Sequence, residues 1–85
     1  MRWRYLPKTV QYPFDKNDLK MRAAYDGSGN LQYIGYAAPG TATSAAAWQI
    51  RKLTYSGGDV TQVDFAGSVN DYTKAWDDRA TYAYG

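Results

Sequence analysis

Hydrophobic and polar positions alternate on both sides of a glycine pair near the middle of the chain. Two β-prone runs within residues 48–66 flank Gly57 and Gly58, and a Gly-Gly pair can supply the positive φ angles of a two-residue hairpin turn. Counting outward from this turn places Tyr55 opposite Val60. The same count gives three further pairs: Leu53 with Gln62, Arg51 with Asp64, and Ile50 with Phe65. The pattern therefore predicts a long central hairpin.

This register gives the central hairpin two different faces. The predicted core face carries Trp48, Ile50, Val63 and Phe65. The other face carries the apolar residues Leu53, Tyr55 and Val60 and an opposite-charge pair, Arg51 and Asp64. Such a cross-strand pair contributes about 0.2–1 kcal/mol. A slip of one residue would exchange the faces. The second face is too apolar for solvent alone, so we expect the N-terminal segment or a neighbouring subunit to cover it.

A second hairpin is predicted at residues 20–37. A strand from about Lys20 to Tyr25 meets the turn-forming segment 26–30, whose composition is Asp-Gly-Ser-Gly-Asn,. The return strand is 31–37, and Gly35 inside it indicates a bulge or a close backbone approach,.

The remaining segments complete a small β domain. A connection of small residues spans 38–44, and the strand that contains Trp48 is extended backward through residues 45–47. Asn70 can cap a helical turn near 70–76, and the segment 79–84 reads as a last strand. The predicted fold is all-β: a small antiparallel sheet or sandwich of about five strands, with one short helical turn near 70–76.

Residues 1–19 are predicted to form an extended basic and aromatic arm that precedes a β domain at 20–85. Pro7 and Pro13 favour extended conformations,. Aromatic residues two positions apart would lie on one side of an extended segment; they are Trp3 with Tyr5, and Tyr12 with Phe14. Disordered segments are typically poor in aromatics. Two interpretations remain open: an arm lying along a neighbouring subunit, or an edge strand of the same chain.

The residue chemistry argues against an enzyme. The chain has no histidine, cysteine or glutamate, which removes the usual general base and the soft metal ligands,. Asp26, Ser28 and Asn30 alternate as calcium ligands do, but Leu31 and Ala37 stand where the loop glycine and the bidentate glutamate belong,. Arg79 beside two aspartates indicates a surface ion pair,. We therefore expect no catalytic residue, no metal site and no cofactor.

Charge is distributed unevenly along the chain. Residues 1–22 contain six cations and two anions, a balance of +4, and residues 23–85 have a balance of −2. A basic arm of this kind can bind nucleic acid or an acidic protein surface. The cations form no dense tract, which argues against nucleic acid. No apolar run reaches about 18 residues and no secretory leader is visible, so neither membrane insertion nor secretion is expected.

Residues 25–85 resemble small virion proteins of tailed bacteriophages. The resemblance rests on four runs: Tyr33-Ile34-Gly35, Ala37-Ala38-Pro39-Gly40-Thr41-Ala42-Thr43-Ser44, Trp48-Gln49-Ile50-Arg51-Lys52-Leu53-Thr54-Tyr55, and Lys74-Ala75-Trp76-Asp77-Asp78-Arg79-Ala80. It covers about two-thirds of the chain, and the N-terminal arm is not part of it. It implies a structural component of the virion, assembled in the host cytoplasm, present in many copies and without catalysis.

The residues and the resemblance together predict a head–tail connector or neck, tail or capsid-decoration protein. It would form homo- or hetero-oligomers with other virion proteins in a symmetric particle. The expected partner-binding residues are basic or aromatic: Arg2, Trp3, Arg4, Tyr5, Tyr12, Phe14, Tyr82 and Tyr84. The alternative is a receptor- or glycan-binding β module of a phage tail, because exposed aromatic rings can stack on sugars.

Overall fold

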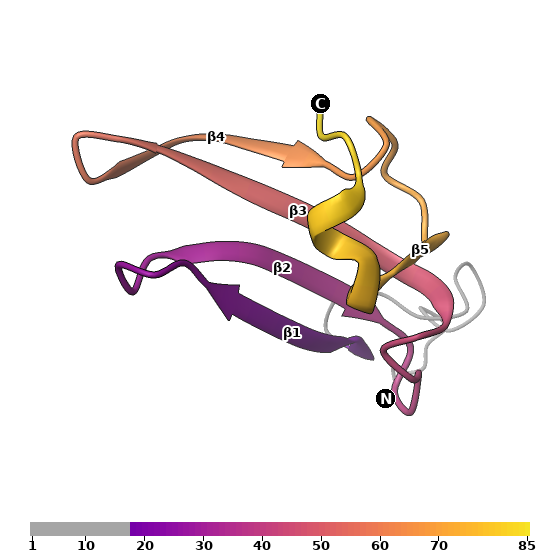
Figure 1. Cartoon of the computed structure of the whole chain (residues 1–85). Coiled ribbons are helices and arrows are strands. Elements are labelled where there is room, and N and C mark those ends of the chain that lie inside the picture. Colours follow the sequence, from indigo (N-terminus) through magenta and orange to yellow (C-terminus); the bar gives the residue numbers. More distant parts are fainter. Residues whose placement is uncertain (1–17) are drawn as a thin grey trace, which may run out of the picture.

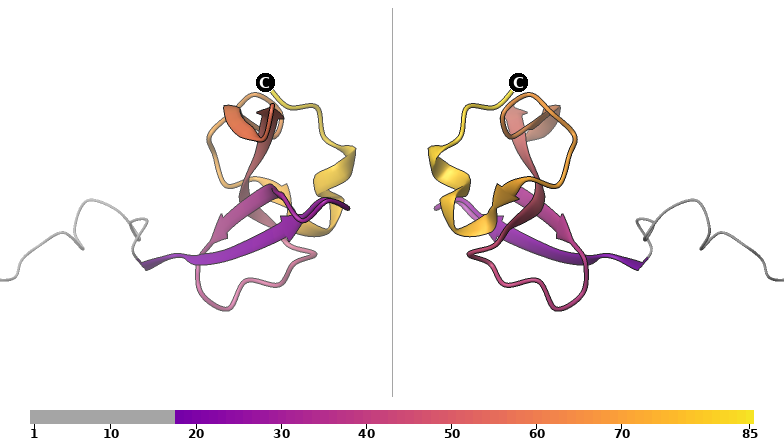
Figure 2. Two further views of the ribbon diagram at one scale, coloured as in Figure 1. Left: turned by 90° about the vertical axis from the view of Figure 1, so that its left-hand side faces the viewer. Right: turned by 90° about the vertical axis from the view of Figure 1, so that its right-hand side faces the viewer.

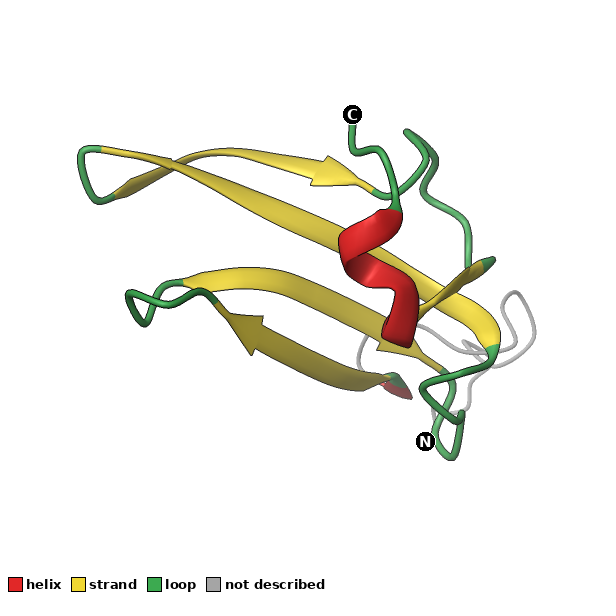
Figure 3. Cartoon of the chain, viewed as in Figure 1, coloured by secondary structure: helices red, strands yellow, loops and turns green. Residues whose placement is uncertain are grey.

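The computed structural model describes residues 18–85 and confirms the all-β prediction (Figure 1). Four antiparallel strands lie in chain order, and a short fifth strand pairs with β3. One short 3-10 helix, η2, follows near the C-terminus (Figure 3). The elements are β1 Lys20–Tyr25, β2 Leu31–Ala37, β3 Ala46–Ser56, β4 Asp59–Phe65, β5 Lys74–Ala75 and η2 Trp76–Thr81.

The first hairpin, β1–β2, has the predicted strands and turn. The Asp26 carboxylate accepts hydrogen bonds from the backbone N–H groups of Ser28 and Asn30, at 2.8 and 3.0 Å. These bonds fold the loop as an Asx turn. Tyr25 is paired with Leu31 and Ala24 with Tyr33, so a β-bulge interrupts the ladder beside the turn.

The second hairpin, β3–β4, has the predicted turn but not the predicted register. Gly57 and Gly58 both have positive φ, 61° and 90°, as a two-residue turn requires,. Tyr55 is opposite Val60 as expected, but Thr54 is opposite Gln62. Thr61 is therefore an extra residue, and this β-bulge shifts every later pair by one position. The three predicted pairs beyond it are wrong: the ladder contains Leu53 with Val63, Lys52 with Asp64, and Arg51 with Phe65.

The bulge exchanges the faces of β4. Val63 and Phe65 now share a face with Leu53 and Arg51, not with Trp48 and Ile50,. The prediction that Val63 belongs to the core is wrong, since its side chain is 46% exposed. Phe65 is only partly buried, so β3 alone supplies the core residues that the sequence assigned to both strands.

The two hairpins share a short seam and then separate. β2 and β3 pair only from Tyr33 with Lys52 to Tyr36 with Gln49, and the two hairpin tips lie well apart (Figure 1). The Tyr55 hydroxyl donates a 2.6 Å hydrogen bond to the carbonyl oxygen of Leu31 beyond this seam. One side chain therefore links the hairpins where their backbones no longer meet.

The C-terminal segment differs from the prediction in two places. The helical turn is η2, at Trp76–Thr81, rather than a turn near 70–76. Ala75 is paired with Ala46 and Lys74 with Trp48, so strand pairing occupies residues that the predicted turn required. The segment 79–84 is not a strand; only Tyr84 forms an isolated bridge, with Ala66.

The core lies between one face of the sheet and η2, and we call this side of the sheet the core face. Figure 2 shows η2 on one side of the two hairpins. The buried cluster contains Ala37, Trp48, Ile50, Ala66 and Trp76. Gly35 lies directly beneath the Trp76 ring, so the predicted close approach is correct, although a side chain makes it rather than backbone.

Candidate interaction surface

The opposite side of the sheet, the open face, presents apolar side chains to solvent. Within residues 18–85 no helix or strand lies over it. Four of its apolar residues are strongly exposed: Met21 at 56%, Tyr25 at 64%, Val60 at 48% and Val63 at 46%. Register and side-chain alternation define the whole face, which comprises Met21, Ala23, Tyr25, Ile34, Tyr36, Gln49, Arg51, Leu53, Tyr55, Val60, Val63 and Phe65. Contiguous apolar surface of this kind marks an interaction site more often than scattered residues do.

Arg51 lies at the centre of the open face between two aromatic rings. Its guanidinium carbon is 5.1 Å from the Tyr36 ring centre and 5.0 Å from that of Phe65. These cation–π contacts hold the charge against the sheet. Its Nε and Nη2 donate to the Gln49 side-chain oxygen at 3.0 and 2.8 Å. Among the residues of 18–85 that form this face, Arg51 is the only cation and none is a carboxylate.

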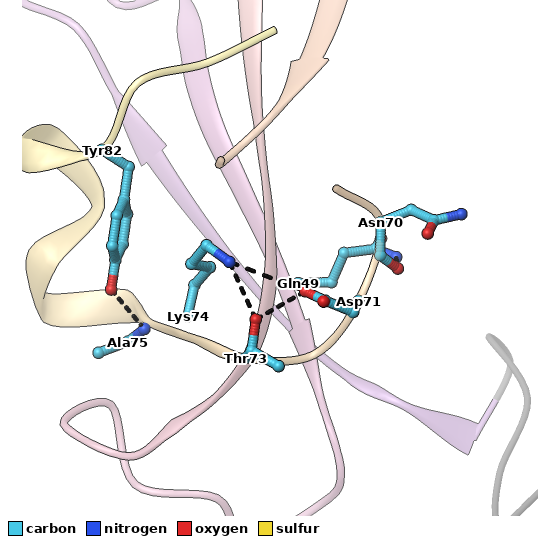
Figure 4. Close-up of polar contacts among 7 residues, drawn as sticks. All are labelled: Gln49, Asn70, Asp71, Thr73, Lys74, Ala75 and Tyr82. Atoms are coloured by element: carbon cyan, nitrogen blue, oxygen red, sulfur yellow. Dashed lines mark hydrogen bonds and ion pairs between the residues drawn. The ribbon is translucent and has the colours of Figure 1, made fainter. Parts of the chain in front are cut away.

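Gln49 links the open face to the loop that follows β4. Its side chain is 6% exposed, and its Nε2 donates to the carbonyl oxygen of Asn70 at 2.7 Å (Figure 4). Asp71 accepts a hydrogen bond from the Thr73 hydroxyl and is 3.7 Å from the Lys74 ammonium. The loop that follows β4 is therefore held to the sheet.

Tyr82 and Tyr84, two of the predicted partner-binding residues, pack onto the core face. The Tyr82 hydroxyl accepts a 2.9 Å hydrogen bond from the Ala75 N–H (Figure 4). The Tyr84 hydroxyl donates to the Arg79 carbonyl oxygen at 2.7 Å. These hydrogen bonds give both tyrosines a structural role. Both side chains remain partly exposed, and their role in partner binding stays a prediction.

The Arg79 side chain packs against aromatic rings and does not pair with the aspartates beside it in the sequence. Its guanidinium carbon is 4.7 Å from the Trp76 ring centre and 6.0 Å from that of Tyr33. Its Nη1 also donates to the Trp76 carbonyl oxygen at 3.2 Å. The surface ion pair expected from the sequence is replaced by a cation–π stack that closes the core over Trp76.

The environment of Tyr84 predicts a loss of stability at alkaline pH. Burial raises the pKa of the Tyr84 hydroxyl well above its ordinary value, and the nearby Tyr33 and Tyr82 raise it further. The folded chain therefore holds this proton more tightly than the unfolded chain. Its contribution is complete below about pH 10 and declines as the pH rises above that value.

Replacing Tyr84 with phenylalanine tests this effect. We expect the variant to lose about 1 kcal/mol at neutral pH, because the hydrogen bond to Arg79 is removed. Its unfolding free energy should then fall less steeply than that of the parent above about pH 10. Urea unfolding at a series of alkaline pH values measures both slopes. Equal slopes would contradict the assignment.

The other predicted partner-binding residues belong to the N-terminal arm. Residues 1–17 lie outside the described residues, and they include Arg2, Trp3, Arg4, Tyr5, Tyr12 and Phe14. Three exposed residues of the open face were missed as binding candidates: Met21, Tyr25 and Val63. Val60 was already placed on a face expected to be covered. The alternation of Met21, Ala23 and Tyr25 could have indicated one apolar side of β1, but the bulge at Thr61 concealed Val63.

Residues 18–85 contain no group of three or more acidic, cysteine or histidine side chains arranged to hold a metal ion. Among the same residues, no helix is both long and apolar enough to cross a membrane. No protein-family model, curated protein or solved structure matches this chain. The open face and the arm are therefore the features from which a function can be argued.

Proposed function

We propose that this chain is a non-enzymatic structural protein of a bacteriophage virion, which docks on a larger symmetric assembly. The observation that carries the proposal is the open face, where apolar side chains of β1 and β4 are about half exposed or more. A monomeric soluble domain seldom leaves such a face uncovered. Burial of apolar anchors on a partner supplies most of the energy of a protein–protein interface.

The resemblance to small phage virion proteins supports the class of assembly. Three of its runs form the end of β2 with the following connection, β3, and the β5–η2 segment. These segments supply Trp48, Ile50 and Trp76, the largest residues of the core cluster. The resemblance therefore concerns the scaffold. The surfaces proposed to contact a partner are the arm and the open face, whose most exposed residues lie on β1 and β4.

The charge of the open face indicates the kind of partner surface. Arg51 is held between Tyr36 and Phe65, and its immediate polar neighbour is Gln49 rather than a carboxylate. A partner that offers apolar side chains around one acidic group would complement this face. The arm, residues 1–19, carries four cations against two anions and would meet further acidic groups on the neighbour.

Deletion of residues 1–19 tests how the chain is incorporated. We expect the truncated chain to keep a folded β domain, because β1 begins at Lys20, but to be absent from purified particles. The arm would no longer contribute its aromatic anchors and cations. Circular dichroism measures folding, and mass spectrometry of particles from the virus that encodes the chain measures incorporation.

A full-length variant provides the matched comparison. Replacing Trp3, Tyr5, Tyr12 and Phe14 with serine keeps the length and charge of the arm and removes its aromatic rings. This variant should also fail to enter particles. Normal incorporation of both variants would contradict the role of the arm, and absence of the parent chain from particles would contradict the proposed function itself.

A further inference from the structure

Among residues 18–85, the two edges of the sheet differ: the β4 edge is paired at its C-terminal end, whereas the β1 edge has no strand beside it. At the β4 edge, Phe65 and Gly85 exchange two backbone hydrogen bonds of 3.0 and 3.1 Å, and Gly67 donates to Ala83 at 2.7 Å. At the other edge, β1 pairs with β2 alone, and no strand among residues 18–85 lies on its outer side. An unpaired edge of this kind is a template for pairing with another strand.

The residues that present their backbone to this edge can be identified. The Asp26 N–H donates to the Asn30 carbonyl oxygen at 2.8 Å and therefore points into the β1–β2 hairpin. In an antiparallel strand the N–H and C=O of one residue point to the same side, and the side alternates along the chain. Met21, Ala23 and Tyr25 consequently direct their N–H and C=O groups outward.

We propose that two copies of this chain pair through β1, antiparallel, across a two-fold axis that passes beside Ala23. Ala23 then faces Ala23 of the second copy, and Met21 faces Tyr25 of the second copy in both directions. Each facing pair exchanges its outward backbone hydrogen bonds. The exposed Met21 and Tyr25 side chains meet on the open face, where a thioether against an aromatic ring is a favourable contact.

The core-face side of β1 is also self-complementary in this register. The register that opposes Ala23 with itself also opposes Lys20 with Asp26 of the second copy, and Arg22 with Ala24. Opposite charges facing each other across antiparallel strands are stabilising. Lys20 already bonds to the Thr41 carbonyl oxygen at 3.2 Å, and its ammonium keeps further donors for the second copy.

Neighbouring registers fit less well. An axis beside Arg22 would place two guanidinium groups directly opposite each other, and like charges in that position are destabilising. An axis beside Ala24 would leave Met21 with no facing strand residue. The register centred on Ala23 is the one that uses both exposed apolar residues of β1, and it joins the open faces of the two copies into a single surface.

Pairing of this kind does not depend on a virion role, and solution measurements test it. The full-length parent is expected to have a mass of twice 9.5 kDa at high concentration in light scattering coupled to gel filtration. Ala23→Lys places two ammonium groups opposite each other and should raise the dimer Kd by about tenfold or more. The matched control, Ala80→Lys, changes an exposed residue of η2 and should dimerise as the parent does.

A cross-linking experiment tests the position of the axis. Ala23→Cys has a single thiol, because the sequence contains no cysteine. Facing residues of a hydrogen-bonded pair have Cα atoms about 5.5 Å apart, within the range of a disulfide. Mild oxidation should therefore convert Ala23→Cys to a covalent dimer much faster than Ala80→Cys. A parent that stays monomeric, equal Kd values for the two lysine variants, or equal cross-linking rates would overturn the proposal.

Discussion

Replacement of Trp48 with alanine is expected to lower the free energy of unfolding by about 3–5 kcal/mol. The Trp48 side chain is fully buried and its ring centre lies 5.9 Å from that of Trp76. Its Nε1 donates a 3.0 Å hydrogen bond to the Ala42 carbonyl oxygen, so the substitution also leaves that acceptor without its partner. Small domains have only about 5–15 kcal/mol of stability in total, and the variant should be largely unfolded at modest denaturant concentrations.

Val63→Ala provides the comparison for Trp48→Ala and also tests the register of β4. Counting from the Gly57-Gly58 turn places Val63 in the core, whereas the structure leaves it 46% exposed. The structure therefore predicts a loss under about 1 kcal/mol for Val63→Ala. Urea unfolding followed by circular dichroism measures both variants. A loss for Val63→Ala that approaches the loss for Trp48→Ala would contradict the bulge at Thr61.

The central hairpin shows how far periodicity predicts this fold. The turn was predictable because two adjacent glycines with positive φ satisfy a requirement that other residues seldom meet,. The bulge was not, because any residue in Val60-Thr61-Gln62 can be the extra one and none has a distinctive backbone preference. One inserted residue then reverses the face of every later residue of β4, which moved Val63 from the predicted core to the surface.

The C-terminal segment was misread for a different reason. Asn70 and Asp71 are good residues for a helix start, but their local preference competes with tertiary contacts. The carbonyl oxygen of Asn70 accepts a hydrogen bond from the Gln49 side chain, and Lys74 pairs with Trp48 on β3. The helical turn therefore begins only at Trp76. Contacts between segments far apart in the sequence decided this boundary, and a local pattern does not contain them.

The candidate interaction surface was only partly predictable. The sequence indicated that Leu53, Tyr55 and Val60 form a face too apolar for solvent, and these residues do belong to the open face. The position of Arg51 between Tyr36 and Phe65 was not predictable, because it requires the register of two strand pairs at once. Aromatic content alone led instead to Tyr82 and Tyr84, whose hydroxyls are bonded within the chain.

Substitution of Gly35 with alanine should have an effect larger than the size of one methyl group suggests. A Cβ atom at this position would lie 2.5 and 2.7 Å from two carbon atoms of the Trp76 ring and 3.1 Å from the Trp48 ring. Neither ring can move easily, because both are buried and Arg79 lies over Trp76. Overpacking of this kind typically costs about 1–3 kcal/mol, and here it should also loosen η2.

Gly27→Ala isolates the steric part of the Gly35→Ala effect. A Cβ atom at Gly27 would have no atom within 4 Å, and its φ is not positive. The same change should therefore be neutral there, or stabilising by about 0.4–1 kcal/mol through the unfolded chain. Urea unfolding compares the two variants, and tryptophan fluorescence, to which Trp3, Trp48 and Trp76 all contribute, reports a change in the packing of the buried pair. Equal stability and unchanged fluorescence for both variants would contradict the packing of the two tryptophan rings on Gly35, because a Cβ atom meets those rings at Gly35 and meets no atom at Gly27.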